Sequence, residues 1–69
     1  MYAREIKNGT RYRRFSISRG DGSGWLVREE RDDQAVHEDQ YDDWHRVERA
    51  QRQFSMVADE LTGTGWTEA

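Results

Sequence analysis

The feature that most constrains the fold is the spacing of apolar residues in the last third of the chain. They recur at steps of three and four residues, which is the period of one face of an α-helix: Trp44, Val47, Ala50, Phe54, Val57, Ala58 and Leu61. Asp42 or Asp43 can cap the first free N–H groups, and Gly63 is a typical stop. The pattern predicts one amphipathic helix over about residues 42–62, followed by a C-terminal tail at 63–69.

The first half of the chain consists of short alternating segments separated by turn residues. They predict strands at about 2–7, 10–19 and 23–31, and a fourth strand at 34–39 is left open. Strands come first and the helix last, which favours an α+β fold. We therefore expect a single small domain, 1–69, built as an antiparallel β-meander of three to four strands. One long C-terminal amphipathic helix packs on one face of its sheet.

The turns suggest how the strands pair. Asn8-Gly9 suits a type I′ hairpin turn, which would place Lys7 opposite Thr10. A three-residue loop at 20–22 would place Ile17 opposite Trp25. In these registers one set of apolar side chains shares the core side of the sheet: Tyr2, Ile6, Phe15, Ile17, Trp25 and Val27.

One helix covers only one face of the sheet, so the other face is the candidate binding surface. It displays Tyr12, Arg14, Leu26 and Arg28. An aromatic ring that stacks on bases, next to guanidinium groups that meet phosphates, is typical of single-stranded nucleic-acid binders. The alternatives are a solvated polar face or a protein interface. Glutamates beside the arginines would repel a phosphate backbone and favour a protein partner.

Composition limits the chemistry of the chain. It has 69 residues, of which 33% are hydrophobic and 36% charged, and it has no cysteine. A core this small is marginal and no disulfide can support it, which favours association with a second copy. Residues 1–31 carry a net charge of +4 and residues 32–69 a net charge of −7, for a total of −3. Complementary surfaces within or between molecules, or a nucleic-acid face, would explain this asymmetry.

Catalytic, metal and membrane functions find little support in the sequence. His37 and His45, with carboxylates between them, are the one cluster of metal-type ligands, but their spacing matches no compact metal site. The chain has no cysteine nucleophile and no serine in a nucleophile-elbow context. We expect no catalytic site, no metal and no cofactor. No signal peptide or long apolar run is present, so we expect a cytoplasmic protein without a membrane role.

Two resemblances to known families concern parts of the chain. The stretch from Ala50 and Phe54 to Leu61-Thr62-Gly63-Thr64-Gly65-Trp66 resembles the end of WGR domains, where a helix closes on a glycine-containing turn and a tryptophan. The Trp-Gly-Arg tripeptide itself is absent, with Trp25-Leu26-Val27-Arg28 in the comparable strand region, so the nucleic-acid-linked role of that family is not carried over. The order of elements is also similar to one repeat of the PUR family, whose repeats pair to bind single strands.

These observations lead to two functional expectations. The first is a small non-enzymatic binding module that binds single-stranded nucleic acid through the open face of the sheet. The alternative is a homodimeric structural or regulatory protein-protein interaction domain with no nucleic-acid role.

Overall fold

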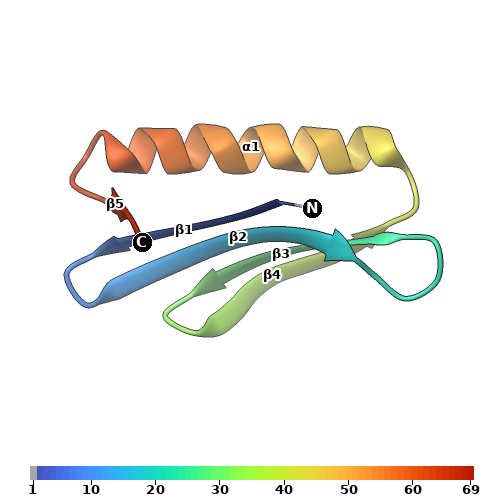
Figure 1. Ribbon diagram of the computed structural model, residues 1–69, viewed down its shortest axis with the longest axis horizontal. Helices are drawn as coiled ribbons and strands as arrows, with labels where there is room; N and C mark the ends of the chain where they lie inside the picture. Colours follow the sequence, from blue (N-terminus) through green and yellow to red (C-terminus); the bar gives the residue numbers. More distant parts are fainter. Residues whose placement is uncertain (1) are drawn as a thin grey trace.

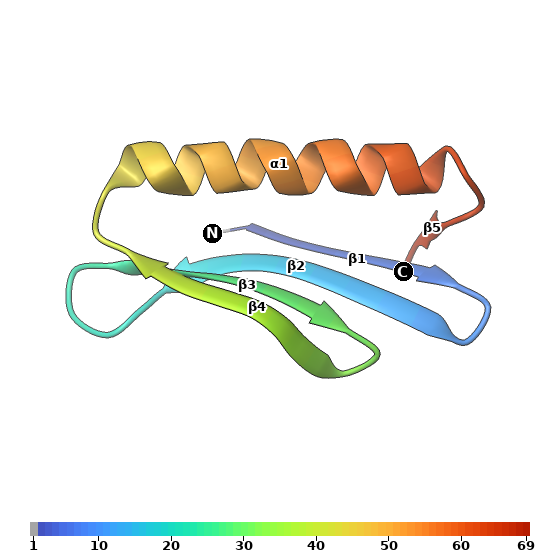
Figure 2. The same cartoon turned by 180° about the vertical axis from the view of Figure 1, so that it is seen from behind.

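The computed structural model describes residues 2–69 and shows a five-stranded antiparallel sheet with one helix on it (Figure 1). The elements are β1 (Tyr2–Asn8), β2 (Arg11–Arg19), β3 (Trp25–Arg31), β4 (Gln34–Tyr41), α1 (Trp44–Thr62) and β5 (Thr67–Glu68). Their order across the sheet is β4-β3-β2-β1-β5. The predicted α+β meander with a C-terminal helix is confirmed. The view from behind shows that α1 lies on one side of the sheet only (Figure 2).

The ends of α1 agree with the capping residues in the sequence. The carboxylate of Asp43 accepts a hydrogen bond of 3.0 Å from the backbone N–H of His45, which satisfies one of the free donors of the first turn. The helix ends at Gly63, whose N–H donates to the carbonyl of Asp59 at 3.2 Å. Gly63 is right-handed, with a φ of −77°, so the first residue with positive φ after the helix is Gly65.

The first hairpin is shifted by two residues from the predicted pairing. Asn8 pairs with Arg11, so the turn is Gly9-Thr10, and the predicted pairing of Lys7 with Thr10 is wrong. Gly9 has a φ of 62°, whereas Thr10 lies outside the left-handed region. A positive φ at the first central residue alone is characteristic of a type II′ turn. Like the predicted type I′ turn, it matches the right-handed twist of the two flanking strands.

The second hairpin is also shifted by two residues. Ile17 pairs with Val27, not with Trp25, and the loop spans residues 20–24. Gly24 explains the longer loop, because a Cβ built on it would lie 3.0 Å from the carbonyl oxygen of Tyr41. The loop therefore packs closely against the end of β4 before β3 begins. Since a shift of two residues preserves the side of each side chain, the predicted core face is unchanged.

Two further segments complete the sheet. β4 follows a turn in which Asp32 and Asp33 have φ of 51° and 66°, the conformation of a type I′ turn, and it pairs with β3 on both sides of a bulge at Val36. The fourth strand that the sequence left open is therefore present. The prediction that 63–69 is only a tail is wrong for β5, which pairs with Ile6 and Lys7 of β1. A two-residue strand is too short to leave a periodic signal in the sequence.

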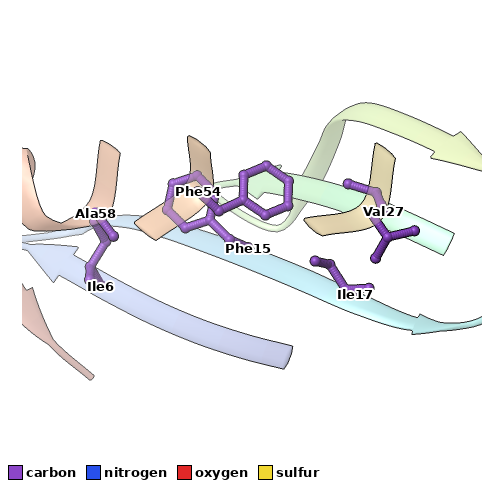
Figure 3. Close-up of a cluster of buried hydrophobic side chains, with 7 residues drawn as sticks. Ile6, Phe15, Ile17, Val27, Phe54 and Ala58 are labelled. Carbon is purple, nitrogen blue, oxygen red and sulfur yellow. The ribbon is translucent and has the colours of Figure 1, made fainter. Parts of the chain in front are cut away.

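The core lies between α1 and the sheet. Phe15 and Phe54 are at its centre, with ring centroids 5.1 Å apart. Figure 3 shows the strand side chains pointing up toward those of the helix. The buried hydrophobic residues are Ile6, Phe15, Ile17, Val27, Val47, Phe54 and Ala58.

Candidate functional site

The open face, which we define as the side of the sheet remote from α1, carries the four predicted binding residues together. Tyr12 and Arg14 lie on β2, Leu26 and Arg28 lie on β3, and all four are half-buried. They alternate with the core residues of the same strands, which places them on the side opposite α1. The same face also carries Ala3, Glu5, Lys7, Ser16, Ser18, Glu30, Ala35, Glu38 and Gln40.

Arg14 lies between two carboxylates on the open face. Its cross-strand partners are Glu5 on β1 and Glu30 on β3. The Nε atom of Arg14 is 3.6 Å from Oε1 of Glu5. Directly opposite residues of antiparallel strands interact most strongly, so these acids neutralise the guanidinium where a phosphate would have to bind.

Arg28 has the same kind of surroundings. Its Nε atom is 3.1 Å from Oε1 of Glu30 and 3.6 Å from Oε2 of Glu38, which lies opposite on β4. The cations Lys7, Arg14 and Arg28 are balanced by the anions Glu5, Glu30 and Glu38, so the formal charge of the open face is zero. Sequence reasoning anticipated the first two acids. It missed Glu38 because the fourth strand was left open.

Tyr12 lies at the charged end of the open face. Burial raises the pKa of its phenol, and the neighbouring carboxylate of Glu5 raises it further. Its backbone N–H donates to Oδ1 of Asp32 at 2.9 Å, which ties the start of β2 to the turn between β3 and β4. The backbone of Tyr12 is therefore anchored to the turn, and its phenol has an acidic neighbour in Glu5.

A groove lies on the other side of the sheet, between α1 and the β3–β4 hairpin. Its volume is about 370 Å³, and its apolar floor includes Phe15, Val27 and Phe54. At its rim, Oε2 of Glu29 accepts hydrogen bonds from Nη2 of Arg13 at 2.7 Å and from Nε of Arg31 at 3.0 Å. Burial opposes ionisation of Glu29, but these bonds outweigh it and hold its pKa below the ordinary value. The shape of this groove was not predictable from the sequence, because it depends on the angle at which α1 crosses the sheet.

The two histidines lie on different elements. His37 is on β4 beside the carboxylate of Asp39, and His45 is on the outer surface of α1, 3.9 Å from Glu48. Across residues 2–69, no three histidine, aspartate or glutamate side chains come together as a metal site. Over the same residues, no helix is long and apolar enough to cross a membrane.

Comparison of the chain with protein-family models, with curated proteins and with solved structures finds no match to any of them. The resemblance to WGR domains therefore rests on the residues between Ala50 and Trp66 alone. The resemblance to PUR repeats rests on the order of elements.

Proposed function

We propose that the protein is a non-enzymatic protein-protein interaction domain that acts as a homodimer. The observation that carries this proposal is the pairing of both open-face arginines with carboxylates of the same face. A single-stranded nucleic-acid site needs a positive groove that follows the phosphates. A face whose charges are paired and sum to zero lacks that positive groove, and a protein partner with complementary charges suits it better.

The size of the core supports the homodimer. Seven hydrophobic residues of a 69-residue chain are buried. Chains of this length are marginally stable by themselves and often gain stability by association. The absence of cysteine fits a reducing compartment, and we propose that the protein acts in the cytoplasm.

Sedimentation equilibrium of the protein from micromolar concentrations upward tests the homodimer. We expect a reversible monomer–dimer equilibrium over this range of concentrations. A monomer mass at the highest soluble concentration would overturn the proposal.

Fluorescence anisotropy with short labelled single-stranded DNA and RNA at low salt tests the competing function. We expect no binding at about 100 μM protein, a concentration at which even non-specific nucleic-acid binders are largely occupied. Binding that weakens by about 1–3 kcal/mol in Tyr12→Ala, and is unchanged in the control Ser18→Ala, would replace the protein-interaction proposal by nucleic-acid binding.

A further inference from the structure

The outer edge of β4 is the longest unpaired strand edge of the sheet. β4 has eight residues and stands at the end of the strand order. On the opposite edge, β5 pairs with Ile6 and Lys7 of β1. Among residues 2–69, no backbone group pairs with the outer side of β4. A row of free N–H and C=O groups of this length is a template for another strand.

The side chains of β4 leave this edge accessible. The strand contains neither proline nor lysine, residues that often protect edges, and its bulge at Val36 lies near its start, before the stretch from His37 to Tyr41. Val36 is 52% exposed and has no apolar cover. The two carboxylates of the strand already have partners within the chain: Glu38 lies near Arg28, and Asp39 lies beside His37 and accepts a hydrogen bond from the hydroxyl of Tyr41 at 3.3 Å.

We propose that two copies of this chain pair antiparallel through their β4 edges, about a two-fold axis at Glu38. This inference rests on the proposed function and names the surface by which the copies meet. The axis must be perpendicular to the sheet, because only that operation reverses the strand and maps the edge onto itself. The occupant of each edge is thus the β4 strand of the other copy.

Charge selects this register. An axis at Glu38 places His37 of each copy opposite Asp39 of the other, and both side chains lie on the helix side of the sheet. The two Glu38 side chains then face each other, but each has its own Arg28 3.6 Å away. An axis at Asp39 would instead place two aspartates opposite each other, each with only its own His37 beside it, and would leave both histidines without an acidic partner in the other copy.

The arrangement has consequences for both surfaces described above. A two-fold axis perpendicular to the sheet keeps both helices on one side and both open faces on the other. Two five-stranded sheets become one continuous sheet, and the joined β4 strands lie between the two grooves beside α1. The open face of the dimer is twice as large as that of one copy.

Sedimentation equilibrium of two matched variants tests the edge. Val36→Lys and Met56→Lys each replace an exposed hydrophobic residue by lysine, the first on β4 and the second on the outer surface of α1. We expect Val36→Lys to weaken dimerisation about tenfold or more, and Met56→Lys to leave it unchanged. Loss of the dimer in Met56→Lys alone would overturn the inference and place the interface on the helix, and the proposed homodimer would stand.

Two complementary single variants test the register. His37→Asp and Asp39→His each lose the pair between these two residues within the chain, and in the proposed register each variant alone places like side chains opposite each other. A one-to-one mixture of the two variants restores unlike partners at both positions of the mixed dimer, and we expect the mixture to dimerise more tightly than either variant alone. If the mixture dimerises no better than the single variants, the register is wrong. If the wild-type protein is a monomer, both this inference and the proposed function fail.

Discussion

Arginine side chains have different surroundings on the two sides of the sheet. On the helix side, Arg13 is 15% exposed and shares Glu29 with Arg31, so its charge is committed to the structure. On the open side, the side chains of Arg14 and Arg28 are 42% and 39% exposed. Their Nε atoms lie 3.1–3.6 Å from the nearest carboxylate oxygens, farther than Nη2 of Arg13 lies from Glu29. Exposed pairs contribute little to stability, because water screens them. Substitution of Arg14 or Arg28 should therefore have little effect on folding.

Glu29 should make the protein sensitive to acid. Its pKa is lower in the folded chain than the ordinary value of 4.5, so its contribution to stability is fully present above that pH. It is lost as the pH falls below 4.5 and through the folded pKa. In urea unfolding at neutral pH, Glu29→Gln should lower the free energy of unfolding by about 1–3 kcal/mol, because two arginines lose their acceptor.

At pH 3 the difference between Glu29→Gln and the wild-type protein should shrink, because this pH lies below the ordinary pKa of 4.5 at which the carboxyl of the unfolded chain takes up its proton. Glu48→Gln is the matched control, since Glu48 lies on the surface of α1 with 46% exposure. An equal deficit of Glu29→Gln at both pH values would show that the ion cluster does not control the acid transition.

At the scale of elements, the sequence identifies what is periodic and misses what depends on turn conformation. The helix limits were predictable because Asp43 and Gly63 supply the local hydrogen bonds that end a helix. The faces of the strands were predictable because alternation survives a shift of two residues. The pairing was not, since Gly9-Thr10 and Asn8-Gly9 are both acceptable hairpin turns. The residues of β2 and β3 on the open face were predictable. The net charge of that face was not, because it depends on Glu38, whose position follows from the pairing of β4 with β3.

The apolar stripe of α1 has a direct test. Phe54 is 8% exposed and packs on Phe15, whereas Met56 is 69% exposed. Phe54→Ala should lower the free energy of unfolding by about 3–5 kcal/mol, which is most of the stability of so small a domain. Met56→Gln should change it by less than about 0.5 kcal/mol. A wild-type melting midpoint for Phe54→Ala would contradict the packing of α1.

Two glycine substitutions should have opposite effects on stability. Gly9 has a φ of 62° with no atom near a built Cβ, so Gly9→Ala should cost about 1–2 kcal/mol from backbone strain alone. Gly63 has a φ of −77° and only ordinary contacts, so Gly63→Ala should stabilise the protein by about 0.4–1 kcal/mol. Thermal melts compare the two variants, and a Gly9→Ala variant that melts no lower than the wild-type protein would contradict the positive φ at Gly9.

In the whole molecule, the two edges of the sheet differ in how far other parts of the chain cover them. The β1 edge is closed by the end of the chain: the N–H of Ala69 donates to the carbonyl of Glu5 at 2.9 Å. Nε of Arg4 donates to Oε1 of Glu68 at 2.6 Å, and Arg4 also contacts Asp59 on α1. These bonds raise the pKa of Arg4 above its already high ordinary value, so the Arg4 guanidinium stays positively charged. The end of the chain thus covers the β1 edge from Glu5 to Lys7, which would limit the proposed pairing to the β4 edge.

Removal of Thr67–Ala69 should therefore open a second edge. The truncated chain loses the backbone bonds of β5 and the Arg4–Glu68 pair, so its free energy of unfolding should fall by about 1–3 kcal/mol. It should also form species larger than a dimer in sedimentation velocity, because each copy then has two free edges. Glu68→Gln is the control: it weakens the ion pair, keeps β5 and should give no larger species. If the truncated chain sediments like the full chain, closure by β5 is not what limits assembly.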